Sequence, residues 1–308
     1  MNIIELTAPV DITLVQKLSE FEALFDYPLG SNQRFRIDHS PDYTAFYRAM
    51  GQAKTWVIES GNIVVAAISA SIRTIGFEGA IKHVVYMGDL KIHSDYQSGR
   101  VLFKMAEYLR PLLEQDATAA YSVVMDGTKI TPEHYTGRLG VPKFKPVAKI
   151  HILRFETAIN AKIVGQSQAN RGYELYRELN PVYTHEPALS QLRSSITPSW
   201  FIHNDLACAM AEDTRLAKKL YLISGEELLS SHLSYFAFND APSGFLVIQQ
   251  ALNWSANNGF PAMFVALSEK QMLLLTNYLQ GLQHTAAAAT IYATDNICDH
   301  IPINTAEI

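Results

Sequence analysis

The sequence predicts an α/β protein built from two similar units in tandem. β-rich runs alternate with segments of helical periodicity along the whole chain. A strand, a short turn that ends in Ser-Gly and a helix occur twice in that order. A polar, aperiodic stretch separates the two copies. The predicted boundaries are 1–156 for the first unit, 157–170 for a linker and 171–308 for the second unit.

Composition narrows the class of protein. The chain has 308 residues, of which 48% are apolar and 18% charged, with a net charge of -5. The acidic balance argues against a nucleic-acid partner. No window approaches the roughly 20 apolar residues that span a membrane. The two cysteines, Cys208 and Cys298, have no metal-ligand spacing and fit a reducing cytoplasm.

The elements of the first unit follow from periodicity and capping signals. Asp11 is a plausible N-cap for the first helix, and Ser60-Gly61-Asn62 is typical of a hairpin turn. The predicted strands are 2–6, 55–59, 63–73, 83–92, 119–125 and 149–155, and the predicted helices are 12–25, 42–50 and 99–113.

The second unit is expected to repeat this plan. Residues 206–211 and 216–223 are predicted to form its hairpin, followed by a strand at 232–238, a helix after Gly244 and a strand at 262–267. The turns at 95–99 and 240–244 then hold the same place in the two units. The neutral, apolar stretch at 285–294 suits packing better than catalysis.

The turn after strand 83–92 is the strongest pointer to function. A strand that leads through a Ser-Gly turn into a helix presents free backbone N–H groups at the positive end of the helix dipole. Such a junction suits a phosphate-bearing ligand. The alternative is an ordinary helix N-terminus that binds nothing.

Several motifs of the first unit resemble the GCN5-related N-acetyltransferase (GNAT) superfamily. Residues 88–97 (GDLKIHSDYQ) resemble its central strand and the lead into its pyrophosphate loop. Residues 126–128 (DGT), Tyr135, Gly140 and 141–144 (VPKF) resemble the elements that follow. Over 171–308 the likeness is one of element order. The resemblance implies tandem GNAT-like domains, each a mixed, twisted sheet flanked by helices, with a degenerate second copy.

The resemblance also implies a cosubstrate, acetyl-CoA, and the residues that bind it. Pantetheine would run along the central strand at Leu90, Lys91 and Ile92. The pyrophosphate would lie on the loop N–H groups of Gln97, Ser98, Gly99, Arg100, Val101 and Leu102. No metal is expected, because the histidines show no ligand spacing.

The loop departs from the family pattern Gln/Arg-x-x-Gly-x-Gly/Ala. Arg100 and Leu102 stand where small residues are expected, although the charge of Arg100 can compensate in part. The second loop has Gly244 alone and no basic residue nearby. We therefore expect the first unit to keep the cofactor site and the second to have lost it.

Two residues are candidates for proton transfer. Tyr135 would be the general acid, although it lies five residues before Gly140 and the family pattern has four; the alternative is a surface tyrosine. Asp89 would be a base or an orienting group. Because aspartate is disfavoured in strands, the alternative is a structural hydrogen bond or salt bridge.

The predicted function is that of an acetyl-CoA-dependent N-acyltransferase that moves an acetyl group to a small-molecule or peptide amine. The alternative is a non-catalytic acyl-CoA-binding or regulatory protein that retains the fold. A further alternative is that the second unit serves only as a surface for a homodimer or as a lid.

Overall fold

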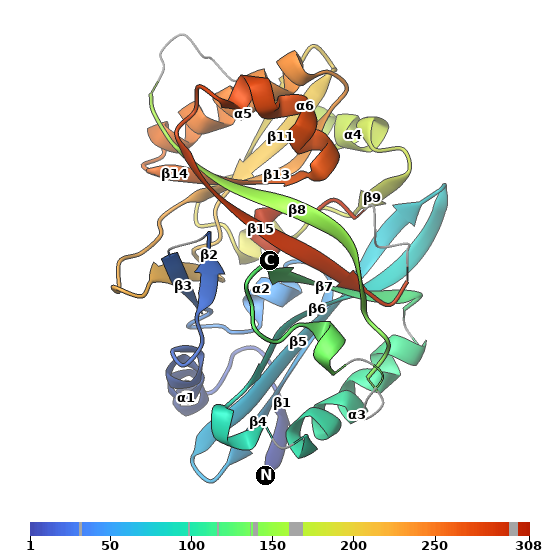
Figure 1. Cartoon of the computed structure of the whole chain (residues 1–308), viewed down its shortest axis with the longest axis vertical. Coiled ribbons are helices and arrows are strands. Elements are labelled where there is room, and N and C mark those ends of the chain that lie inside the picture. The colour runs from blue at the N-terminus through green and yellow to red at the C-terminus, as the bar shows by residue number, and fades with distance from the viewer. Residues whose placement is uncertain are drawn as a thin grey trace.

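The computed structural model describes residues 1–30, 33–97, 99–115, 117–135, 137, 141–159, 169–295 and 301–308. Within these ranges the chain forms a twelve-stranded mixed sheet flanked by helices, with a separate three-stranded sheet beside it (Figure 1). The predicted fold class is confirmed.

The described elements have the following bounds. The strands are β1 (Asn2–Glu5), β2 (Tyr27–Leu29), β3 (Gln33–Asp38), β4 (Gln52–Ser60), β5 (Ile63–Phe77), β6 (Ala80–Ile92), β7 (Ala119–Met125), β8 (Lys145–Glu156), β9 (Tyr183–His185), β10 (Ser199–His203), β11 (Ala207–Glu212), β12 (Lys219–Leu222), β13 (Ser231–Phe238), β14 (Ala262–Ser268) and β15 (His284–Ala293). The helices are α1 (Ile12–Glu22), α2 (Ala45–Arg48), α3 (Arg100–Gln115), α4 (Ala169–Leu179), α5 (Ala241–Asn257) and α6 (Glu269–Leu279), with 3-10 turns η1 (Ser94–Tyr96), η2 (Pro132–His134), η3 (Ser190–Leu192) and η5 (Thr305–Glu307).

The strand order shows the internal repeat. In the first unit β4, β5, β6 and β7 are neighbours, paired antiparallel, antiparallel and parallel in turn. In the second unit β10, β11, β13 and β14 are neighbours with the same sequence of directions. Helix α3 connects β6 to β7, and α5 connects β13 to β14. The parallel pairs therefore have helical crossovers, as parallel pairing requires.

The last strand of each unit lies against the other unit. Strand β15 pairs with β7, and β8 pairs with β14, while β8 and β15 also pair with each other. Figure 1 shows β8 and β15 as long neighbouring strands that cross the middle of the molecule. The apolar stretch at 285–294 is thus a sheet strand that joins the two units.

Local patterning explains the helices that were predicted well. Val101, Met105, Ala106 and Leu109 form the buried face of α3 at the spacing the sequence shows. The Asp11 side chain accepts a hydrogen bond from the Thr13 N–H at 2.9 Å and caps α1, as expected. None of the described helices is both long and apolar enough to cross a membrane.

The predicted hairpin between 206–211 and 216–223 is wrong. Strand β11 pairs with β10 and β13, and β12 pairs with β3 in the small sheet. Glu212, Asp213 and Thr214, which lie between the two segments, are buried. Glu212 accepts hydrogen bonds from Arg193, and Asp213 accepts one from the Ser194 hydroxyl at 2.6 Å. These partners fix Glu212 and Asp213, and a turn begins at Thr214, whose carbonyl accepts a hydrogen bond from the Ala217 N–H at 2.9 Å.

Candidate functional site

Strands β6 and β7 run parallel but pair over only three residues before they diverge. The pairs are Val84↔Ala119, Val85↔Ala120 and Tyr86↔Tyr121. Beyond them β6 continues to Ile92, whereas the rest of β7 pairs with β15. We call the opening between these two diverging strands the first splay.

A β-bulge shapes the β6 side of the first splay. The register between β5 and β6 shifts between Ala67 and Ser69, and Asp89 has a φ of 54° in the left-handed region. A Cβ on Gly88 would lie 2.6 Å from the Tyr47 hydroxyl oxygen. Glycine at position 88 therefore lets Tyr47 pack closely against the strand beside Asp89.

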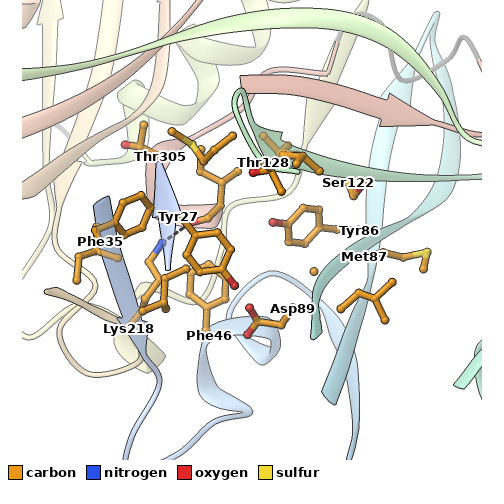
Figure 2. Close-up of a pocket in the computed structure, with 18 of the residues that line it drawn as sticks. Tyr27, Phe35, Phe46, Tyr86, Met87, Asp89, Ser122, Thr128, Lys218 and Thr305 are labelled. Atoms are coloured by element: carbon orange, nitrogen blue, oxygen red, sulfur yellow. Dashed lines mark hydrogen bonds between the residues drawn. The ribbon is translucent and has the colours of Figure 1, made fainter. Parts of the chain in front are cut away.

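A cavity of about 220 Å³ occupies the first splay. Met87 and Asp89 of β6 line it, as does Ser122 of β7 (Figure 2). Leu90 of β6 also lines the cavity. The second unit contributes Lys218, His232, Phe264 and Thr305 to the wall. The cavity is thus built by both units, and most of its lining is apolar or aromatic.

Asp89 belongs to a buried cluster of charged side chains. Lys91 Nζ lies 3.0 Å from Asp89 Oδ1 and 2.9 Å from Glu22 Oε1. His39 Nδ1 lies 2.8 Å from Glu22 Oε1 and 3.4 Å from Asp89 Oδ2. The Tyr43 hydroxyl donates to Asp89 Oδ2 at 3.1 Å. The two carboxylates, the histidine and the lysine of this cluster are each at most 6% exposed.

The cluster keeps its carboxylates ionised. Burial by itself raises the pKa of Asp89, but the Lys91 ammonium and His39 lower it to about 2. The pKa of Glu22 is lowered as well, because His39 and Lys91 outweigh its burial.

Atoms of Glu22, His39 and Asp89 lie within 4.8 Å of one another, the spacing of a metal site. The Lys91 ammonium already contacts both carboxylates there and supplies a cation from within the chain.

Tyr135 follows η2 and lines the same cavity, half-buried against the first-unit core. Burial raises the pKa of its hydroxyl to about 12. The hydroxyl is therefore protonated at neutral pH, which is the state a proton donor needs.

Other polar groups face the cavity from the far side. Lys218 is buried, its Nζ lies 4.5 Å from the centre of the Phe46 ring, and it donates to the backbone oxygen of Ile308. Burial lowers the pKa of Lys218 to about 7. The hydroxyl oxygens of Ser122 and Thr128 are buried, with no hydrogen-bond partner among the described residues. Figure 2 shows both hydroxyl residues across the cavity from Asp89.

Solved structures share this architecture. A structure of Saccharomyces cerevisiae N-myristoyltransferase with bound myristoyl-CoA matches 94% of this chain and 82% of that one, with a TM-score of 0.60 and 12% identity. A GCN5-related N-acetyltransferase from Kribbella flavida matches 95% of this chain and 70% of that one, with a TM-score of 0.50 and 10% identity. The fold is GNAT-like. The sequence matches no family model and no curated protein.

In this GNAT-like fold, the residues predicted to bind the cofactor lie in two places: on strand β6, and in the loop that leads into α3. Leu90 lines the cavity, while Lys91 is buried in the charged cluster and Ile92 packs at the edge of the core. The loop residues lie beyond the end of β6, at the N-terminus of α3. Gly99 has a φ of 84°, Gln97 and Arg100 are exposed, Leu102 is half-buried and Val101 is fully buried. Ser98 lies outside the described residues.

The sequence prediction missed most of the cluster around Asp89. Glu22 ends α1, and His39 follows β3, both far from Asp89 in the chain. One signal was available: Lys91 is a charged residue between two apolar residues of a buried strand, so it required an acidic partner. No comparable signal marks Lys218 or Thr305, because only the exchange of strands brings the second unit to the cavity.

Proposed function

We propose that the protein is an acyl-CoA-dependent N-acyltransferase. The observation that carries this proposal is the first splay, with its cavity and the N-terminus of α3 directly beyond it. The matched yeast enzyme has myristoyl-CoA bound. In the proposed complex, pantetheine runs along Leu90–Ile92, and the pyrophosphate meets the N–H groups of residues 97–102 and the charge of Arg100.

The proposed reaction needs little chemistry from the protein. The acceptor nitrogen attacks the thioester carbonyl, a C–N bond forms, and the C–S bond breaks to release the thiolate. Tyr135 gives that thiolate its hydroxyl proton, and the proton that the acceptor nitrogen loses passes through solvent to the Tyr135 phenolate, which restores the hydroxyl. With a pKa of about 2, Asp89 is a weak base, so we assign it the role of orienting the acceptor amine.

The acyl group and the acceptor are finer proposals. Acetyl-CoA is the first donor to test, since the motifs of the first unit resemble acetyltransferases. The apolar cavity also has room for longer acyl groups, so donors of increasing chain length belong in the same series. The proposed acceptor is a small-molecule or peptide amine, and the proposed location is the cytoplasm.

Calorimetric titration with acetyl-CoA tests the proposal. We expect micromolar binding that the Arg100→Glu variant abolishes, because the new carboxylate would repel the pyrophosphate. Arg110→Glu is the matched control, since Arg110 is an exposed arginine nearer the other end of α3. Absence of binding for every acyl-CoA of the series would overturn the proposal.

One observation favours binding without transfer as the second candidate function. The Asp89 carboxylate already contacts Lys91, His39 and Tyr43, so an acceptor amine would have to share it. A protein that binds acyl-CoA tightly but acylates none of a broad panel of amines would fit this candidate and not the enzyme.

A further inference from the structure

The two central strands carry the same bulge. In the first unit the register with β5 shifts between Ala67 and Ser69, opposite Asp89. In the second unit the register with β11 shifts between Cys208 and Met210, opposite Tyr235. Tyr235 has a φ of 53°, against 54° for Asp89. Tyr235 is therefore the structural counterpart of Asp89.

The second unit also has a splay. Strands β13 and β14 run parallel over three residue pairs, Ser231↔Met263, His232↔Phe264 and Leu233↔Val265. We call the opening beyond these pairs the second splay. It has the same place in the strand order of its unit as the first splay has in the first unit. Helix α5 comes after it in the chain, as α3 comes after the first splay.

The chain itself fills the second splay. Asn304 Oδ1 accepts a hydrogen bond from the Tyr235 N–H of β13 at 2.8 Å. The Thr305 hydroxyl donates to the Phe264 carbonyl of β14 at 3.4 Å, and its oxygen lies 3.0 Å from His232 Nδ1. Asn304 thus binds β13 at Tyr235, beyond the last residue pair, and Thr305 contacts the adjacent pair His232 and Phe264, so both residues lie at the paired end of the second splay.

Buried ion pairs hold this segment. Glu307 lies 3.0 Å from Arg73 of β5 and 3.3 Å from Arg193, and all three side chains are at most 3% exposed. Asn304 Nδ2 donates to Glu307 at 3.0 Å and ties the two ends of η5 together. A ligand that entered the second splay would have to expel these groups and leave buried charges without partners.

The helix that follows the second splay is also closed to a phosphate. Asp240 is the N-cap of α5, and its Oδ1 accepts a hydrogen bond from the Ser243 N–H at 3.0 Å. A carboxylate therefore already occupies the donor end of α5, where it would repel a pyrophosphate. In the first unit, exposed Arg100 begins the equivalent helix.

We propose that residues 301–308 are a built-in occupant of the second splay, which leaves the chain a single acyl-CoA site, in the first splay. The inference that the chain has one acyl-CoA site rests on the proposed function. The inference that residues 301–308 occupy the second splay does not.

Amide hydrogen exchange of Tyr235 tests the occupancy on the full chain. We expect the Tyr235 N–H to be protected in the wild type and to exchange at least roughly tenfold faster in Asn304→Ala, which lacks the acceptor. Asn258→Ala is the matched control, because Asn258 also bonds through its side chain to a backbone group, 2.8 Å from Trp254 O, but at the surface. A Tyr235 N–H that exchanges equally fast in the wild type and in Asn304→Ala would overturn the proposal.

Titration with coenzyme A tests the number of acyl-CoA sites. We expect one equivalent to bind, with exchange slowed in β6 and α3, and residues 301–308 to stay protected at saturation. Two equivalents, or loss of protection in residues 301–308, would overturn the proposal. If coenzyme A does not bind at all, the proposed function fails, and the Tyr235 measurement still decides whether the second splay is filled.

Discussion

Lys91 Nζ lies 3.0 Å from Asp89 Oδ1, and the two residues are only two positions apart in β6. Replacing Lys91 by Met would leave the buried carboxylates of Asp89 and Glu22 without the ammonium that contacts both of them. We expect the free energy of unfolding in urea to fall by about 3–5 kcal/mol. Lys17→Met is the control: its pair with Glu59 is 2.8 Å long but about 18–19% exposed, so its loss costs less than about 1 kcal/mol. Equal losses of unfolding free energy in both variants would contradict the prediction that a buried ion pair costs more to break than a partly exposed one.

The same cluster predicts how stability depends on pH. The pKa of Asp89 is about 2 in the folded protein, against 3.8 for an ordinary aspartate, so the unfolded chain binds more protons between these values. The stabilisation is complete above about pH 5 and is lost as the pH falls toward 2. We expect the stability difference between wild type and Lys91→Met to shrink over that range. A difference that stays constant from pH 6 to pH 2.5 in urea titrations would disprove the coupling.

Gly88 is predicted to tolerate no side chain. In Gly88→Ala the new Cβ would meet the buried Tyr47 hydroxyl at 2.6 Å, which forces the ring or the strand to move. We expect a loss of about 1–3 kcal/mol in unfolding free energy and weaker acyl-CoA binding. Gly281→Ala, where nothing lies within 4 Å of the new Cβ, should leave both unchanged. Equal effects of the two substitutions would rule out the steric explanation.

The buried hydroxyls of Ser122 and Thr128 are predicted to serve a ligand rather than stability. Since neither has a hydrogen-bond partner among the described residues, Ser122→Ala and Thr128→Val should not lower the unfolding free energy. Ser69→Ala, which breaks a 2.9 Å bond to Thr55, should cost about 1 kcal/mol. Acceptor affinity should fall in the first two variants only; unchanged affinity there would mean that the hydroxyls do not contact the acceptor.

Tyr135→Phe separates binding from transfer. Removing the hydroxyl leaves the ring in place, so acyl-CoA affinity should stay within about twofold while the transfer rate falls by about 10²-fold. Tyr108→Phe alters a tyrosine that is 46% exposed on α3 and should change neither quantity. A full transfer rate in Tyr135→Phe would remove Tyr135 from the mechanism.

Local patterns predicted the part of the fold that depends on neighbours in the sequence. The strand of 119–125 and the buried face of α3 agree with the structure because period-2 and period-3.6 signals need no knowledge of partners. The location of β15 could not be predicted in this way. Its alanine-rich sequence has no strong strand preference, and pairing with both β7 and β8 fixes it.

The candidate site also has one part that local patterns predicted and one part that depends on contacts between distant segments. Asp89 and Tyr135 could be singled out because they lie in or beside motifs of the first unit, and both line the cavity. Their roles in catalysis stay predictions. Glu22 and His39 come from separate elements, and Lys218 comes from the second unit, so only long-range packing brings them to the cavity.

The exchange of β8 and β15 has a consequence for the order of assembly. Because β15 pairs with the edge of β7 that faces away from β6, a nascent chain shorter than about 284 residues would leave that edge of β7 open. Contacts between β7 and β15 span more than 160 positions, which favours slow, late closure. The site in the first half of the chain would therefore be among the last parts of the protein to form during synthesis.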